Sequence, residues 1–275
     1  MTTMRTSSAS ESPGPAKSQT DLPSSRPDLP VTLADVILRA AEARPDKLAL
    51  ILPNARYTYG ELAAGAWQTA RSLAGLGVRP GDHVGILLSS GANFVTTLFG
   101  IAMTGAVAVT INTRYRSDEL SFLIEDADLK VLVTDTTNKD YVDYATLIES
   151  ALPDISNADD PFKLGLPGAP LLRSVVILDK DGRPGFIGKS QFEAAAERAD
   201  LGKLRVWCAG VAQRSIAAII YTSGTTSKPR GVVHTNESLV RTWVMTGRRW
   251  SMRADDRFWN PVQLFHIAGI GPLVF

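Results

Sequence analysis

One loop of the sequence gathers side chains that could hold a chain of phosphates. Residues 222–231 read TSGTTSKPRG, which combines hydroxyl groups, two glycines and two cations without a carboxylate. Backbone N–H groups freed by glycine, hydroxyl donors and fixed positive charge are the groups that bind a polyphosphate. The same residue types also form ordinary polar turns, so composition alone leaves a hairpin loop as an equal alternative.

A second candidate is the pair Phe265 and His266, within the run PVQLFHIAGI. Taken alone, a histidine in an apolar run is more often a core residue than a catalytic one. The three histidines of the chain are scattered without metal-ligand spacing, so we expect no protein metal site. Cys208 lies in the apolar run VWCAGVA and is expected to be a buried small side chain, not a nucleophile.

The elements that must position these residues alternate between strands and helices. β-Rich runs at 216–221 and 232–234 flank the loop, so we expect it to face solvent between two adjacent strands of one sheet. Further strands are expected at 48–52, 57–59, 83–88, 106–111, 130–135 and 174–179. Helices are expected at 32–44, 61–76, 94–103, 140–152, 192–198 and 236–250, with another beginning at a Ser117 cap. This alternation predicts an α/β fold of layered sheets and helices.

Composition excludes several classes of protein. The chain has 275 residues, 44% of them hydrophobic, and a formal net charge of +1, which gives no electrostatic reason to expect nucleic acid as a partner. A single cysteine fits a reducing, cytoplasmic setting. The uncharged stretch 85–113 is interrupted by glycine and polar residues, so no membrane span is expected. Residues 1–30 are rich in Ser, Thr and Pro and are expected to be a disordered tail.

The order of residues in YTSGTTSKPRGV resembles the phosphate-loop signature of the AMP-forming adenylating superfamily, which includes acyl-CoA synthetases, luciferases and peptide-synthetase adenylation domains. Residues 57–87 and 104–135 look like two further blocks of that family, and INTRY with TSGTT leans towards the acyl-CoA synthetases. The loop is not a Walker A motif, because Pro229 stands where the second glycine is required. Two positions depart from the family pattern: Ser227 replaces the usual glycine, and Arg230 the usual lysine.

The resemblance implies residues 31–275 to be part of the large N-terminal domain of an adenylate-forming enzyme, incomplete at its C-terminus. It implies a ligase that joins a carboxylic acid, expected to be a fatty acid, to ATP as an acyl-adenylate and then to CoA. Mg²⁺ is implied without an assigned ligand. Phe265 and His266 would line the acyl pocket, with His266 catalytic. The residues implied for ATP binding are Thr222, Ser223, Gly224, Thr225, Thr226, Lys228 and Arg230.

Three functions remain open on the sequence. The first is the acid–CoA ligase. The second is a non-catalytic nucleotide-binding fragment or pseudoenzyme of the same fold, and the third an unrelated phosphotransferase. The chain ends in the apolar run GPLVF, from which we expect no complete catalytic cycle by these residues alone. The acid used and the oligomeric state cannot be read from the sequence.

Overall fold

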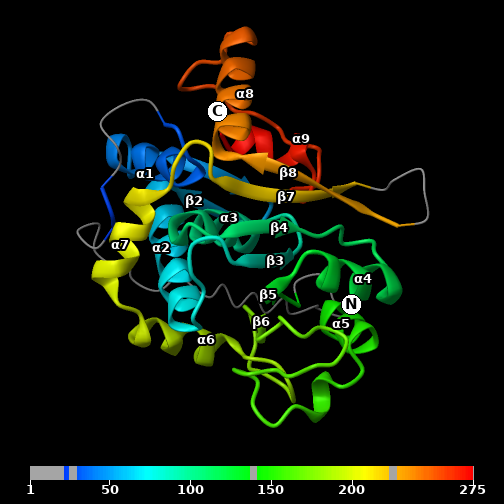
Figure 1. Ribbon diagram of the computed structural model, residues 1–275. Coiled ribbons are helices and arrows are strands. Elements are labelled where there is room, and N and C mark those ends of the chain that lie inside the picture. Colours follow the sequence, from blue (N-terminus) through cyan, green and yellow to red (C-terminus); the bar gives the residue numbers. More distant parts are fainter. Residues whose placement is uncertain (1–21, 25–29, 137–140, 223–227, 275) are drawn as a thin grey trace, which may run out of the picture.

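A largely parallel sheet with helices on both faces organises the molecule (Figure 1). The computed structural model describes residues 22–24, 30–136, 141–222 and 228–274. In these ranges six strands form the main sheet in the order β6-β5-β3-β4-β7-β8, and only the last pair, β7 and β8, is antiparallel. Strands β1 and β2 form a separate antiparallel hairpin. The layered α/β architecture predicted from the sequence is therefore confirmed.

The bounds of the elements follow the chain order. The strands are β1 (Leu48–Leu52), β2 (Ala55–Thr58), β3 (His83–Leu87), β4 (Val107–Thr110), β5 (Leu129–Thr134), β6 (Ser174–Ile177), β7 (Ile216–Thr222) and β8 (Arg230–Thr235). The α-helices are α1 (Leu33–Ala43), α2 (Tyr59–Gly75), α3 (Ala92–Thr104), α4 (Ser117–Asp126), α5 (Tyr144–Ala151), α6 (Lys189–Ala195), α7 (Leu201–Gly210), α8 (Asn236–Arg249) and α9 (Ile267–Ile270). Short 3₁₀ turns are η2 (Ile155–Asn157), η3 (Ala196–Arg198) and η4 (Gly271–Leu273).

The inner strands are apolar on both faces because helices cover both. Along β5, Val131 and Val133 pack into one hydrophobic cluster and Leu132 into the other, as the alternation of side chains along a strand requires. The first cluster includes residues of α1, α2 and α3, and the second includes residues of α4 and α5. Figure 1 shows α4 and α5 on the opposite side of the sheet from α1, α2 and α7.

Most predicted elements are confirmed. Helices α2, α3 and α6 begin two or three residues before the predicted starts, and the starts of α4, α5 and α8 are corrected by their caps. The N-cap of α4 is Arg116, not Ser117, because Glu119 folds back to accept a hydrogen bond from the Arg116 backbone N–H. Helix α5 begins at Tyr144 instead of residue 140, because the Asp143 carboxylate accepts from the N–H groups of the first turn.

The correction at α8 joins distant parts of the chain. Thr235 caps this helix in place of the predicted Asn236. The buried Asn236 side chain instead accepts from the Leu33 N–H at 3.0 Å and donates to the Ser215 carbonyl at 3.2 Å. One amide therefore connects the start of α1 to the start of β7 and α8.

Two other expectations were tested in part. The disordered tail before residue 31 stays a prediction. Within it, Leu22 packs against the core, and its carbonyl accepts from the Arg205 guanidinium at 3.2 Å. Residues 1–21 and 25–29 of the expected tail lie outside the described residues. Over the described part of the chain, no helix has both the length and the apolar character needed to cross a membrane.

Candidate functional site

The β7–β8 hairpin presents the predicted phosphate loop at its tip. Strand β7 ends at Thr222, and β8 begins at Arg230, directly opposite in the antiparallel register. The Thr222 hydroxyl donates to the Arg230 carbonyl at 3.5 Å, and both residues are exposed. The prediction that this segment connects two adjacent strands is confirmed. Ser223, Gly224, Thr225, Thr226 and Ser227 lie outside the described residues.

The hairpin leaves the sheet at the carboxyl ends of the parallel strands. Thr110, the last residue of β4, pairs with Ile220, so Thr222 lies about 7 Å farther along β7. The carboxyl edge of a parallel sheet is where open α/β folds bind their ligands, because strand-to-helix loops converge there. Thr222 and Arg230, which border the predicted phosphate loop, therefore lie at the edge at which this fold class places its sites.

The second predicted segment is tied to the same edge. The buried Thr110 hydroxyl donates to the Phe265 carbonyl at 2.8 Å. Just beyond β3, the Ser90 hydroxyl donates to the Gln263 side chain at 2.8 Å and accepts from the Leu264 N–H at 3.0 Å. Residues 263–265 thus lie across the ends of β3 and β4, beside the strand that carries the loop.

Phe265 and His266 differ in their exposure to solvent. The Phe265 ring is buried in the core, whereas the His266 side chain is exposed at the N-cap of α9. Their ring centroids lie 4.4 Å apart at an interplanar angle of 45°. Of the predicted pair, His266 therefore faces solvent at the sheet edge and Phe265 forms the wall behind it.

Two contacts on α4 flank the undescribed tip of the hairpin. The Tyr221 hydroxyl donates to the Asp126 carboxylate at 2.6 Å, and the Lys228 ammonium lies 4.6 Å from the centroid of the Phe122 ring. Burial, followed by the Asp126 carboxylate, raises the pKa of Tyr221. Asp126 and Phe122 carry no sequence signal of this role, because both contact residues about 100 positions away and neither belongs to a motif.

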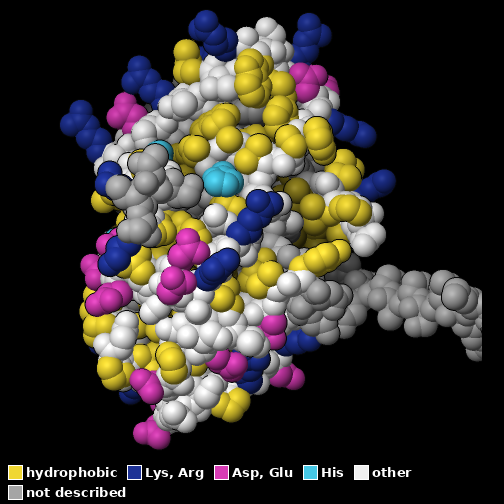
Figure 2. Space-filling model, turned by 90° about the vertical axis from the view of Figure 1, so that its right-hand side faces the viewer, with side chains coloured by type: hydrophobic (Ala, Val, Ile, Leu, Met, Phe, Trp, Pro, Cys, Tyr) yellow, Lys and Arg dark blue, Asp and Glu magenta, His cyan; other side chains and the backbone are white. Residues whose placement is uncertain are grey.

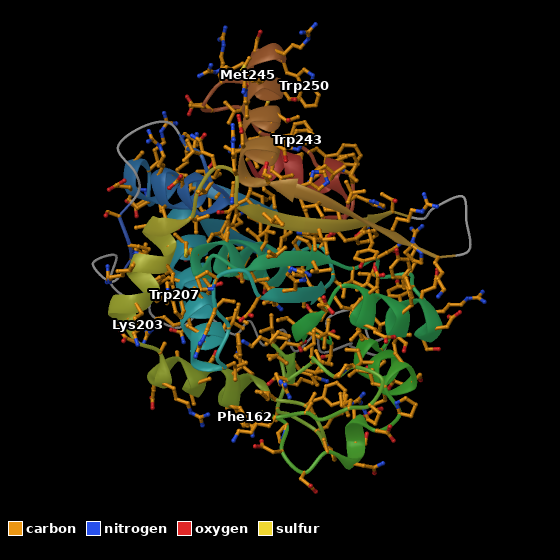
Figure 3. All side chains as sticks on the ribbon, viewed as in Figure 1. Phe162, Lys203, Trp207, Trp243, Met245 and Trp250 are labelled. Carbon is orange, nitrogen blue, oxygen red and sulfur yellow. The ribbon has the colours of Figure 1, made fainter. Side chains whose placement is uncertain are left out.

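The outer side of the hairpin is apolar and exposed. Val233 on the edge strand β8 is 56% exposed, while its neighbour His234 is half-buried, and burial lowers the pKa of that imidazole. Figure 3 shows Trp243, Met245 and Trp250 along α8, the helix that follows β8. Trp250 is 53% exposed. Figure 2 shows apolar side chains gathered over the upper part of this face.

The charges near the loop suit an anion. Lys228 and Arg230 stand on its C-terminal side, and Thr222 brings a hydroxyl to its N-terminal side. The nearby Asp126 carboxylate accepts a hydrogen bond from the Tyr221 hydroxyl. Across the described residues, no three His, Cys, Asp or Glu side chains lie close enough together to hold a metal ion. We therefore assign no protein ligand to Mg²⁺. The arrangement can bind and neutralise a polyphosphate beside an apolar wall.

Comparisons with known proteins agree with this geometry. The family model described as AMP-binding enzyme matches residues 37–275. A relative is the putative acyl-CoA synthetase YngI of Bacillus subtilis, 28% identical over 240 residues, covering 86% of this chain and 43% of that protein. The long-chain-fatty-acid–CoA ligase FadD13 of Mycobacterium tuberculosis is 31% identical over 247 residues, covering 87% of this chain and 42% of that protein. The chain thus spans less than half the length of these curated relatives.

A solved structure shares the fold at detectable sequence identity. The anthranilate CoA ligase AuaEII, solved with anthranoyl-AMP, superposes with a TM-score of 0.69 at 27% identity. The match covers 90% of this chain and 44% of that one. The likeness in fold therefore extends over nearly the whole chain.

Proposed function

The chain belongs to the AMP-binding enzyme family, and from that premise we propose that it forms the ATP- and acid-binding part of an AMP-forming acid–CoA ligase. The single observation that carries the proposal is that Thr222 and Arg230, at either end of the ordered sequence TSGTTSKPRG, lie at the carboxyl edge of the parallel sheet, where Phe265 and His266 also lie. A composition of this kind could belong to any turn, whereas its order and its place in the sheet together match an ATP site.

The chemistry requires positioning and the neutralisation of phosphate charge. In the first step a carboxylate oxygen attacks the α-phosphorus of ATP and pyrophosphate leaves, which gives the acyl-adenylate. In the second step the CoA thiolate attacks the acyl carbon and AMP leaves. Hydroxyl and backbone N–H donors of residues 222–226 would hold the β- and γ-phosphates, and Lys228 and Arg230 would balance the charge that leaves with pyrophosphate.

The acid is assigned to the apolar side of the site. Phe265 gives a buried aromatic wall, and the His266 imidazole stands at its exposed rim, where it would meet the carboxylate and later the thiol. We assign a fatty acid as the substrate, which the similarity to a long-chain-fatty-acid–CoA ligase supports. Relatives named for aromatic acids, such as the 4-hydroxybenzoate–CoA/benzoate–CoA ligase of Rhodopseudomonas palustris at 28% identity, define the competing substrate class.

Binding tests the assignment without requiring a full catalytic cycle. The purified chain is titrated by calorimetry with ATP, with a non-hydrolysable long-chain acyl-adenylate analogue and with the benzoyl analogue. We expect saturable binding of ATP and tighter binding of the long-chain analogue. Tighter binding of the benzoyl analogue would overturn the fatty-acid assignment, and absence of binding by all three would overturn the ATP site.

ATP–pyrophosphate exchange tests whether the chain catalyses the adenylation step or only binds the nucleotide. ATP–pyrophosphate exchange is assayed over a panel of carboxylic acids alongside the titrations. Nucleotide binding without exchange fits the expectation that these residues do not complete the reaction alone, and equally fits a pseudoenzyme. Exchange that disappears in Thr225→Ala would overturn that expectation and show that the adenylation step is complete in this chain.

A further inference from the structure

Helix α4 holds both flanks of the phosphate-binding hairpin on one face. Phe122 and Asp126 are four residues apart, so their side chains lie one turn apart on the same side of the helix. Asp126 contacts Tyr221, the residue before Thr222, and Phe122 contacts Lys228, the first described residue after the tip. In Figure 1, α4 lies below the far end of the hairpin.

The Tyr221–Asp126 contact is short, and it joins a buried tyrosine to an exposed carboxylate. The hydroxyl donates to a carboxylate oxygen at 2.6 Å, in the range of charge-assisted O–H···O bonds, and Tyr221 is only 6% exposed. Bonds of this kind hold geometry more firmly than neutral ones, since the acceptor carries a full charge. The end of β7 is therefore fixed relative to α4 just before the chain turns into the loop.

The absence of a side chain at Gly231 allows the Tyr221 ring to pack across the hairpin from β7 onto β8. Tyr221 and Gly231 are paired across β7 and β8, and a Cβ built on Gly231 would lie 3.1 Å from the Tyr221 Cζ and 2.8 Å from the Ile219 Cγ2. The tyrosine ring therefore covers the glycine backbone, which leaves no room for a side chain there. The Tyr221 ring thus packs against β8, while its hydroxyl donates a hydrogen bond to Asp126 of α4.

Lys228 gives the second anchor. Its ammonium lies 4.6 Å from the Phe122 ring centroid, within the range of a cation–π contact. The ring orients a long, flexible cation at the point where the chain re-enters β8. Without such a contact the lysine would lose more conformational entropy on meeting a ligand.

We propose, on the basis of the function assigned above, that Asp126 and Phe122 are positioning residues for ATP, acting through Tyr221 and Lys228 respectively. They set the angle at which the β7–β8 hairpin offers its hydroxyl and cationic groups to the phosphates. Neither side chain touches the nucleotide. Their effect appears as affinity for the triphosphate, since a preorganised loop loses less freedom on binding.

A mutant cycle on the hydrogen bond tests the proposal. Tyr221→Phe removes only the hydroxyl, Asp126→Ala removes the acceptor, and Asp126→Asn keeps an acceptor oxygen. We expect the Kd for ATP and for inorganic tripolyphosphate to rise roughly three- to tenfold in the first two variants. The double variant should bind no more weakly than either single one, because the pair acts as a unit. Asp126→Asn should recover most of the affinity.

Tyr115→Phe is the matched control. Tyr115 is equally buried, and within the described structure its hydroxyl has no hydrogen-bond partner. Its removal should leave both dissociation constants unchanged. A Kd change in Tyr115→Phe as large as that in Tyr221→Phe would overturn the proposal, since it would reflect general loosening of the core. Phe122→Leu should weaken tripolyphosphate binding by about twofold, because it keeps the apolar contact and loses the π face.

Proteolysis tests the anchoring without any nucleotide. Trypsin can cleave after Arg230 but not at the Lys228–Pro229 bond, so the cleavage rate at Arg230 reports opening of the hairpin. We expect faster cleavage at Arg230 in Tyr221→Phe and Asp126→Ala than in Tyr115→Phe, at a temperature at which all three variants remain folded. Wild-type protein that binds neither ATP nor tripolyphosphate would overturn the proposed function and, with it, the role in ATP binding. Wild-type binding together with unchanged affinity and cleavage in both variants would overturn the positioning role alone.

Discussion

At the scale of single residues, the site depends on groups whose charge is controlled by their neighbours. Tyr221 is the clearest case, since burial and the Asp126 carboxylate both favour the neutral phenol. A proton held there keeps the hydrogen bond to Asp126 intact over the ordinary pH range. The Tyr221 phenol therefore keeps the proton that it donates in this contact until the solution becomes alkaline.

Tyr221 should make the folded protein sensitive to alkali. Its pKa is raised in the folded state above the ordinary value of 10.0, so its contribution to stability is complete below pH 10 and is lost as the pH rises further. Urea unfolding at pH 8 and pH 10.5 measures this loss. We expect Tyr221→Phe to show a smaller decrease than the wild type between these values. The control is Tyr141→Phe, an 86% exposed tyrosine, which should match the wild type.

The two departures from the family loop pattern give a second residue-scale prediction. Arg230 offers a planar fork where the pattern has a point charge, and Ser227 has a Cβ where the pattern has glycine. We expect Ser227→Gly with Arg230→Lys to tighten ATP binding and raise any adenylation rate. Titration and pyrophosphate exchange measure both. Equal or weaker binding would show that the two residues are adaptations of this loop.

At the scale of elements, close contact between α2 and α3 supports one face of the sheet. Gly100 of α3 lies so near α2 that an added Cβ would stand 2.8 Å from the Thr69 Cβ and 2.9 Å from the Ala66 carbonyl oxygen. Neither neighbour is the far end of a flexible side chain. The approach of the two helices therefore requires glycine at this position.

Gly100→Ala should destabilise the fold by about 1–3 kcal/mol, because overpacking a helix contact outweighs the gain in helix propensity. Chemical denaturation measures the change in the free energy of unfolding. Gly210→Ala is the matched control, since Gly210 ends α7 and nothing lies within 4 Å of its added Cβ. Equal stability of the two variants would contradict the steric argument.

Local pattern was enough to predict most elements. Strand β5 is readable because an uninterrupted apolar run flanked by polar residues fits a strand buried on both faces. Helix α7 was missed because Leu204 and Cys208 are its only buried residues, which is too few to show a helical period within the apolar run around Cys208. The loop was found from its order of residues, whereas its support by Asp126 depends on a contact between positions 95 residues apart.

At the scale of the whole molecule, one edge of the main sheet is apolar and exposed. Among the described residues strand β8 pairs only with β7, and Val232 and Val233 are 42% and 56% exposed there. An apolar edge strand can pair with a strand of another molecule. The apolar side chains of α8 extend the same surface.

This edge should drive self-association. Val233→Lys places a charge on the exposed position, so we expect less concentration-dependent association than in the wild type. Sedimentation velocity over a concentration series measures it. Val206→Lys is the control, because Val206 is 69% exposed on α7, away from the strand edge. A similar decrease in both variants would point to net charge as the cause and not to the edge.

The strand order has a consequence for synthesis on the ribosome. β4 pairs with β3 on one side, but its other neighbour, β7, follows about 100 residues later in the chain. At ordinary translation rates that edge stays unpaired for about 5–20 s. During this interval the nascent chain exposes an apolar strand edge.

Crosslinking to ribosome-bound chaperones measures this exposure. We expect crosslinks to chains arrested before β7 and not to chains arrested after α8 has emerged. Equal crosslinking of both would show that the edge is covered in another way. The hairpin that carries the phosphate loop thus also covers the open side of β4 once β7 has been synthesised.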